Sequence, residues 1–440
     1  MKKWLCLALA LCLLPLTALG AELTEFTVRE RLSLSLADGV TYRQWDLTPK
    51  TRSAGMSQRV HLLEADPAAC PGLSVVNLLG QHRVWDNLTP VSRMVKTDQK
   101  ALPGAFLAAV NGDFFDEGNG GPVGYNMEQG EWLTLGEFYD GWAVGFTKDG
   151  RMLLGQPRAT VFLSVQRDDT LILDQFPIRA LNAARADRAE RSVPMNVVDE
   201  RRDNLSVLYT PRYDQTTHTQ GGTELILSVN GDLRTGQTAF GVVQMVYGAG
   251  GLPENTDRKG LPLAEGTMVL SAIGEDAELL SGLRAGDRVY LTCRADPLFD
   301  EAVTVSGGGR PDHGPLLILN GKPADILQAQ ELDANKEYFY SHHARNIAAK
   351  RADGSWFFLV IEGYRAGSYG MPLEWAQQVL LDLGAVTAVN LDGGPSATMV
   401  TALKTGEPFL RSDNSGGRRA EKTVGNALVL ILTPAGNKGE

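Results

Sequence analysis

The chain has 440 residues, of which 43% are hydrophobic and 21% charged, with 48 glycines and 21 prolines. This composition is typical of a globular protein and excludes collagen-like, coiled-coil and wholly disordered classes. The formal net charge of −10 argues against binding to nucleic acid or to an anionic membrane, because both are bound through a basic face. The length allows two or three domains, or one large α/β domain with insertions.

The first twenty residues have the pattern of a secretory signal peptide. Two lysines precede an apolar run over residues 4–14, and small residues at Ala18 and Gly20 suit cleavage before Ala21. A transmembrane anchor is the alternative, but the run is shorter than the ~20 residues that a spanning helix needs. We therefore expect residues 1–20 to be removed on export.

Export changes the charge and the cysteine count. A lipoprotein signal through Cys12 is less well supported, because Leu11 stands where a small residue is expected. Without residues 1–20 the chain has 40 basic and 52 acidic side chains, a net charge of −12, and two cysteines. Cys70 and Cys293 could form one disulfide in an oxidising compartment. We expect a periplasmic or secreted protein that leaves the membrane after cleavage and binds no nucleic acid.

The N-terminal two thirds of the mature chain are predicted to be rich in strands. Residues 21–100 are typical of an extended lead-in, with apolar stretches at 60–63 and 73–79. The turn residues 148–150 (Lys-Asp-Gly) predict a hairpin between strands at 143–146 and 152–154. Between about residues 160 and 305 lies a strand-rich middle that could form a subdomain, with strands at 206–209, 225–229, 241–247, 268–273 and 288–292.

The C-terminal third predicts a hairpin followed by a β–α–β unit. Strands at 346–350 and 356–361 flank an Asp-Gly turn, and a helix begins near Pro372 and ends before Gly384. An apolar strand at 386–391 follows, so a crossover returns the chain to the sheet. Ligands bind at the carboxyl end of such a strand.

We expect an α/β fold with α+β character: a mixed, strand-rich sheet with few helices. It would form a single elaborated domain over residues 101–432, closed by a strand near 428–432. The lead-in over 21–100 would pack on the same body, and residues 433–440 would be a C-terminal tail.

Three acidic residues stand beside glycine at predicted strand ends. They are Asp113 (or Asp116), Glu362 and Asp392, and each alone is most simply a turn residue. Asp392 differs, because its neighbours offer a ligand backbone N–H groups and hydroxyls. These neighbours are Gly393, Gly394, Ser396 and Thr398.

Motifs in consistent order over roughly residues 35–432 resemble the phosphodiester glycosidase family. They are residues 110–115, 307–309, 344–346, 361–363, 389–398, 412–413, 419 and 426–427. Residues 390–394 (Asn-Leu-Asp-Gly-Gly) are the most specific. The chain departs from the family pattern at Pro395, where the family has a third glycine, at Asn346, where it has threonine, and at Glu362, where it has aspartate.

The resemblance implies hydrolysis of the C1–O bond of a sugar-1-phosphodiester, with a carbohydrate phosphodiester or cell-envelope glycan as the partner molecule. The implied catalytic carboxylates are Asp392, Glu362 and Asp413. Arg345 and Arg419 would hold the phosphate, since arginine presents planar paired donors. The remaining substrate-binding residues would be Asn111, Asn390, Gly393, Gly394, Ser396 and Thr398.

Two other functions fit the same residues. A non-catalytic, exported carbohydrate- or cell-wall-binding protein could stack sugars on aromatic side chains such as Trp132 and Tyr364. A metal-dependent hydrolase could use Asp113, Asp116 and Asp392, and their oxygen ligands would favour Ca²⁺ or Mg²⁺. The separation of the carboxylates distinguishes a glycosidase from a binding protein.

Overall fold

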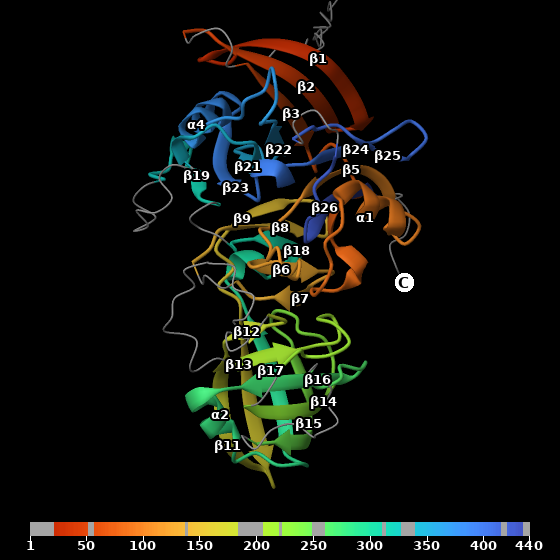
Figure 1. The fold of residues 1–440 in the computed structure, drawn as a ribbon, viewed down its shortest axis with the longest axis vertical. Helices are drawn as coiled ribbons and strands as arrows, with labels where there is room; N and C mark the ends of the chain where they lie inside the picture. The colour runs from red at the N-terminus through yellow and green to blue at the C-terminus, as the bar shows by residue number, and fades with distance from the viewer. Residues whose placement is uncertain are drawn as a thin grey trace, which may run out of the picture.

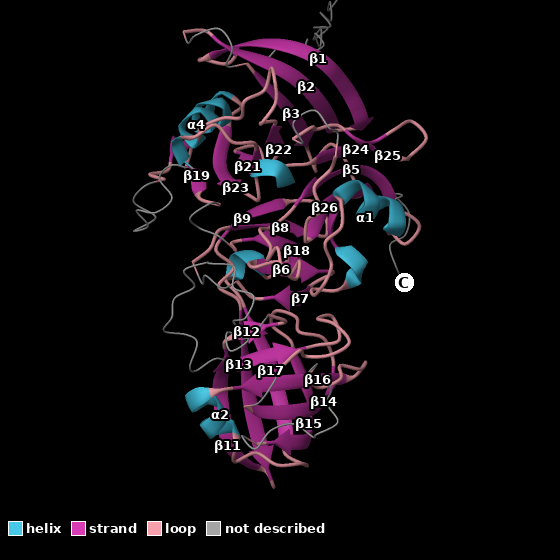
Figure 2. Cartoon of the chain, viewed as in Figure 1, coloured by secondary structure: helices cyan, strands magenta, loops and turns pink. Residues whose placement is uncertain are grey.

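The computed structural model describes residues 22–51, 57–136, 140–183, 206–219, 222–248, 260–309, 314–326, 339–414 and 420–433. The predicted signal peptide, nearly all of the predicted C-terminal tail and Arg419 lie outside these residues. The described chain is dominated by strands, with few helices, which confirms the predicted fold class (Figure 2). Its strands form four sheets, whereas we expected one mixed sheet and a strand-rich middle. None of the helices described is long and apolar enough to cross a bilayer.

Sheet I joins the N-terminal strands to the C-terminal third of the chain (Figure 1). In spatial order its strands are β1 (Phe26–Ala37), β2 (Val40–Pro49), β3 (Gln58–Ala65), β22 (Trp356–Ile361), β21 (Arg345–Arg351), β23 (Ala385–Asn390), β19 (Leu316–Leu319) and β20 (Lys322–Pro323). β3 pairs with β22, with Val60 opposite Ile361. The lead-in is thus hydrogen-bonded into the sheet that carries Glu362 and Asp392.

The predicted hairpin and β–α–β unit lie in sheet I. β21 is antiparallel to both β22 and β23, so β22 and β23 run parallel to each other with β21 between them. The helix α4 (Leu373–Asp382) connects these parallel strands. It begins after Pro372, and Gly384 follows its end with a φ of +80°, the left-handed conformation that glycine adopts without strain.

Sheets II and III pack together against one face of sheet I. Sheet II contains β25 (Pro408–Leu410), β24 (Met399–Ala402), β5 (Ala105–Asn111), β26 (Asn426–Leu432) and β4 (Leu73–Leu79). Sheet III contains β7 (Glu131–Thr134), β6 (Tyr125–Glu128), β18 (Ala302–Gly307), β8 (Ala143–Thr147) and β9 (Met152–Gly155). Phe358 of sheet I, Val110 of sheet II and Phe146 of sheet III belong to one buried cluster.

Alternation along β22 explains why sheet I is buried on both faces. Trp356, Phe358 and Val360 pack toward sheets II and III, whereas Phe357 and Leu359 pack toward α4. Successive side chains of a strand point to opposite faces, so an uninterrupted run of aromatic and aliphatic residues requires cover on both sides. The helix α1 (Val91–Asp98) similarly covers the outer face of sheet II.

Sheet IV is built from the strand-rich middle of the chain and lies at the end of the molecule opposite sheet I (Figure 1). Its strands are β11 (Thr170–Ile178), β10 (Thr160–Arg167), β17 (Arg288–Arg294), β15 (Thr238–Tyr247), β14 (Thr223–Asn230), β16 (Thr267–Ala272), β13 (Ser206–Tyr209) and β12 (Ala180–Leu181). The helix α2 (Gly274–Leu280) lies beside it, and a buried cluster that includes Trp132 of sheet III and Val161 of sheet IV joins the two sheets.

Three features differ from the expectations. Cys70 and Cys293 are both buried and free, so the disulfide that we considered does not form in this structure. The long hairpin β1–β2 was not predicted, although Asp38 and Gly39 between its strands are the same kind of turn as in the other hairpins. The helices α1 and α2 were not predicted either, because 8 and 7 residues are too few to show a clear helical period.

Candidate active site

Acidic side chains follow three strands that end close together. Asp113 comes after β5, Glu362 directly after β22, and Asp392 after β23. The carboxyl ends of β22 and β23 lie at the same edge of sheet I, on either side of β21, because these strands are parallel. Asp113 and Asp392 are near enough for the charge of Asp392 to raise the pKa of Asp113. The three predicted acidic positions thus belong to one region.

Asn111, at the end of β5, ties these segments together. Its Nδ2 donates to the carbonyl of Asp392 at 2.8 Å, and its Oδ1 accepts from the backbone N–H of Thr398 at 2.9 Å and from Asn346 Nδ2 at 3.0 Å. The side chain is fully buried. We expected Asn111 to orient a sugar, but protein groups take up its amide, so its role here is to hold the segment 392–398.

Asp113 is a buried carboxyl group surrounded by backbone N–H groups. Gly124 donates to its Oδ2 at 2.6 Å and Gly309 to its Oδ1 at 3.3 Å. Burial, with a smaller contribution from the neighbouring charge of Asp392, raises the pKa of Asp113 to about 8 against the lowering effect of these hydrogen bonds. Asp113 therefore carries a proton at neutral pH.

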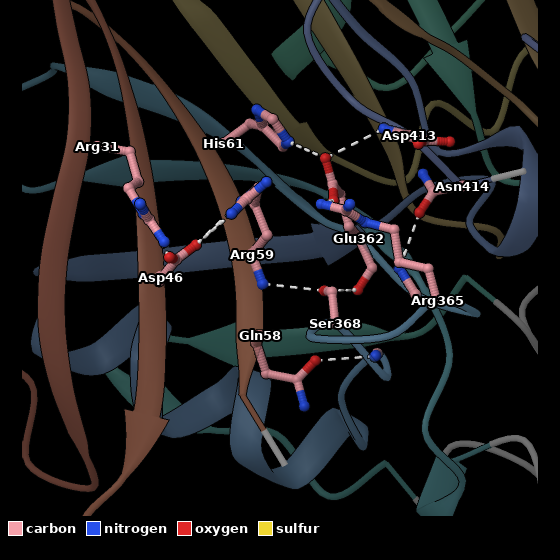
Figure 3. A network of polar contacts seen from close by, with 12 residues as sticks. Arg31, Asp46, Gln58, Arg59, His61, Glu362, Arg365, Ser368, Asp413 and Asn414 are labelled. Atoms are coloured by element: carbon pink, nitrogen blue, oxygen red, sulfur yellow. Dashed lines mark hydrogen bonds and ion pairs between the residues drawn. The ribbon is translucent and has the colours of Figure 1, made fainter. Parts of the chain in front are cut away.

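Glu362 is held from three sides, as Figure 3 shows. Its Oε1 lies 2.7 Å from His61 Nε2 and accepts a hydrogen bond of 3.1 Å from the backbone N–H of Asp413. Its Oε2 forms an ion pair with Arg365. The side chain is only 1% exposed, so a buried charge here is matched by an opposite charge and by donors.

Asp392 opens a tightly bound loop. Its backbone N–H donates to the carbonyl of Gly112 at 3.3 Å, and the N–H of Gly394 donates to the carbonyl of Ala344 at 2.8 Å. Residues Gly394–Ser396 form the short 3-10 helix η6, and Gly394 has a φ of +58°. Asp392 is 8% exposed, whereas Asp113 and Glu362 are 1% exposed.

The guanidinium group of Arg345 donates to backbone carbonyls on the face of sheet I that carries α4. Along β21, Ile347 and Ala349 pack toward α4, and Arg345 lies on the same face by alternation. Its Nε donates to the carbonyl of Met371 at 2.9 Å and its Nη2 to that of Ser341 at 3.2 Å, and the side chain is fully buried. These contacts hold the segment that precedes α4, whereas the role that we predicted for Arg345 is to hold phosphate.

The other predicted binding residues are buried in the loops around Asp392. Asn390 donates to the carbonyl of Leu391, and Thr398 Oγ1 donates to that of Ser396. Asp413 reaches Glu362 through its backbone N–H. The segment after Asp392 and the segment that contains Asp413 line a small pocket together. Its lining residues include Pro395, Ala397, Thr398, Ser412, Asp413 and Asn414.

Three site residues were missed in the sequence. His61 and Tyr42 come from the lead-in, where no motif marked them, and Tyr42 Oη lies 2.8 Å from His61 Nδ1. Arg365 lies three residues after Glu362 in the loop that follows β22, and its side chain pairs with Glu362 and is 21% exposed. A polar residue inside the apolar stretch 60–63 was the available signal for His61, because an unpartnered buried histidine is costly.

The predicted ion site is not seen. Among the described residues, no three His, Cys, Asp or Glu side chains gather in a way that could hold a metal ion. Asp116 and Asp113 have different hydrogen-bond partners. The side chain of Asp116 accepts from the N–H of Gly118 in a local turn.

The fold is shared with solved structures of low sequence identity. A hypothetical protein from Synechocystis is 19% identical with a TM-score of 0.63; the alignment covers 92% of this chain and 64% of that one, so this chain spans less than two thirds of its length. A protein of Burkholderia pseudomallei K96243 is 17% identical with a TM-score of 0.63 over 94% of this chain and 98% of that one.

A third solved structure is the catalytic domain of zebrafish N-acetylglucosamine-1-phosphodiester alpha-N-acetylglucosaminidase, auto-inhibited by its pro-peptide. It is 15% identical with a TM-score of 0.45, over 93% of this chain and 88% of that one. No curated protein matches the chain. Residues 223–431, which carry Glu362 and Asp392, match the phosphodiester glycosidase family, and this confirms the resemblance that the motifs predicted.

Proposed function

We propose that the protein hydrolyses the C1–O bond of a sugar-1-phosphodiester. The observation that carries the proposal is the placement of Asp113, Glu362 and Asp392 after the ends of three strands in one region, in a chain whose residues 223–431 match the phosphodiester glycosidase family. Paired carboxyl groups at a strand edge are the groups that glycoside hydrolysis uses.

The reaction needs two carboxylates with different tasks. Asp392, the most exposed of the three acidic residues, would stabilise positive charge at the anomeric carbon. Glu362 would accept one proton from the attacking water. The water oxygen then bonds to C1, the bond from C1 to the phosphate oxygen breaks, and the phosphate monoester departs with the electron pair.

Asp113 supports this division of tasks. Its pKa of about 8 keeps it neutral at pH 7, so the charge of Asp392 has no second carboxylate charge beside it. Neighbouring carboxyl groups whose environments separate their pKa values are common in acid–base active sites.

Arg365 is the residue that we propose for the phosphate in place of Arg345. Its planar guanidinium group suits a phosphate, and its side chain reaches solvent beside Glu362. If the Arg365 guanidinium group moved from the Glu362 carboxylate to the substrate phosphate, it would exchange one anionic partner for another. Arg419, which we also predicted to bind phosphate, remains a second candidate.

The natural substrate and the location belong to the same proposal. The signal-peptide pattern of residues 1–20 supports export to the periplasm or the medium, where a carbohydrate phosphodiester or a cell-envelope glycan would be the substrate. The net charge of −12 in the mature chain would disfavour general attraction to phosphate polymers, so recognition would rest on a few local cations.

The test compares Asp392→Asn and Glu362→Gln with the wild type on sugar-1-phosphodiesters and on aryl glycosides. We expect kcat on a sugar-1-phosphodiester to fall about 100-fold or more in both variants, with free sugar and phosphate monoester released in equal amounts by the wild type. Arg365→Ala should lose more activity on the phosphodiester than on the aryl glycoside.

Asp353→Asn is the matched control, because Asp353 lies in the turn between β21 and β22, at the end of this hairpin opposite Glu362. It should keep wild-type activity. Undiminished turnover by a folded Asp392→Asn variant would overturn the assignment, and binding of the phosphodiester without turnover by the wild type would favour a carbohydrate-binding protein.

A further inference from the structure

A buried chain of hydrogen bonds runs from the N-terminal hairpin to Glu362. Tyr42 lies on β2 and His61 on the neighbouring β3, and both side chains are fully buried. Tyr42 Oη lies 2.8 Å from His61 Nδ1, and His61 Nε2 lies 2.7 Å from Glu362 Oε1. Figure 3 shows the imidazole directed at the Glu362 carboxylate.

The partners determine which nitrogen of His61 carries the proton. An ionised carboxylate only accepts hydrogen bonds, so Nε2 must donate to Glu362. In a neutral imidazole Nδ1 is then the acceptor, and Tyr42 must donate to it. Burial raises the pKa of Tyr42 well above its ordinary value, and the charge of Glu362 raises it further, so the phenol keeps the proton that this bond requires.

The two oxygens of Glu362 have different surroundings. Oε1 accepts from His61 and from the backbone N–H of Asp413, whereas Oε2 faces the guanidinium group of a single side chain, Arg365. A proton acceptor needs an oxygen that the attacking water can reach. Oε2 becomes such an oxygen once Arg365 turns to the substrate phosphate.

We propose that His61 is the positioning residue of the site. Tyr42 fixes the tautomer of His61 in which Nε2 donates to Oε1 of Glu362, and this hydrogen bond holds the carboxylate so that Oε2 faces the attacking water. This inference rests on the proposed function for its catalytic consequence. It assigns a role to β2 and β3, which lie wholly outside the residues 223–431 that match the family.

Charged groups from several elements surround this chain of bonds. Among the described residues they are Arg59 on β3, whose charge acts on Tyr42, Arg365 after β22, and Arg411 and Asp413 after β25. The guanidinium carbon of Arg411 lies 5.4 Å from the centre of the Tyr42 ring. These charges are common to the wild type and the variants below, so differences between the variants report the chain itself.

The kinetic test uses two substitutions at position 61. In His61→Gln the amide Nε2 can still donate to Glu362, whereas His61→Ala removes the donor. We expect kcat to fall about 10- to 100-fold in His61→Ala, with little change in KM, and to recover largely in His61→Gln. Equal losses in the two variants would overturn the positioning role.

A second substitution tests the part played by Tyr42. Tyr42→Phe removes the hydrogen bond to His61 Nδ1, so kcat should fall about 5-fold, the equivalent of one hydrogen bond. In a His61→Gln background the same change should have little effect on kcat, because no imidazole remains for Tyr42 to hold. Tyr209→Phe, which alters an equally buried tyrosine of sheet IV, is the control and should leave kcat unchanged.

A measurement without substrate separates this inference from the proposed function. Nitrogen NMR of the His61 imidazole in the full mature chain should show the neutral tautomer protonated at Nε2 in the wild type. An Nδ1-protonated imidazole would overturn the inference even if the protein hydrolyses the phosphodiester. If the tautomer is as expected but no sugar-1-phosphodiester is turned over, the proposed function fails and the arrangement of His61 stands.

Discussion

Replacing Asn111 by alanine should destabilise the protein and release the segment that carries Asp392. The side chain makes three buried hydrogen bonds, to the carbonyl of Asp392, the N–H of Thr398 and the amide of Asn346. Each contributes about 1 kcal/mol, and backbone groups left buried without partners add a desolvation cost, so we expect a loss of about 3–5 kcal/mol in the free energy of unfolding. Urea denaturation followed by tryptophan fluorescence measures this loss.

The matched control is Asn182→Ala. Asn182 is also buried and also makes three hydrogen bonds, one to the carbonyl of Leu133 and two to Thr210, but it directly follows β12 of sheet IV. Both variants should lose similar stability, while only Asn111→Ala should reduce kcat per folded molecule on a sugar-1-phosphodiester. A stability loss below about 1 kcal/mol, or equal kcat in the two variants, would refute the view that Asn111 holds the loop of Asp392.

Two further predictions concern buried titratable groups. Because Asp113 has a folded pKa of about 8 against an ordinary value of 3.8, the folded state keeps a proton that the unfolded state loses, so stability should fall as pH rises between these values, by up to about 1.4 kcal/mol per pH unit. Urea midpoints from pH 4 to 9 should show this slope for the wild type but not for Asp113→Asn, and parallel curves would contradict it. Burial raises the pKa of the Cys70 thiol and raises that of Cys293 to about 12, so neither thiol of a chain starting at residue 21 should react with a thiol reagent until the protein unfolds. Reaction of the native protein, or a stability that depends on reductant, would show that the two thiols are exposed or paired.

Much of the fold could be predicted where the pattern was local. The hairpin of β21 and β22 and the helix α4 with Gly384 at its end are encoded by turn residues and by apolar periodicity within a few residues. The division into four sheets could not be predicted, because it depends on pairings between strands hundreds of residues apart, such as β3 with β22.

The site was predictable in its acidic residues and not in their partners. Asp392 and Glu362 stand beside glycines at strand ends, which marks them in the sequence. The direction of the Arg345 side chain depended on the register of β21, which a single sequence does not fix. His61 reaches Glu362 only because β3 pairs with β22, so nothing close to it in the sequence indicated its partner.

The way in which sheet IV is connected has a consequence for the evolution of this architecture. The chain leaves sheet III after Gly155 and returns to it at Ala302, and a Cβ added at Gly155 would lie 2.6 Å from Leu298, so departure and return are neighbours. By topology, sheet IV is an insertion that a short linker could replace. Removing sheet IV would nevertheless destabilise the rest of the protein, because it would expose Trp132, which is fully buried in the cluster shared with Val161. Amino-acid changes in the inserted sequence are therefore constrained on the face toward sheet III. The opposite face, where Phe240 is 56% exposed, is free to change without moving the acidic residues.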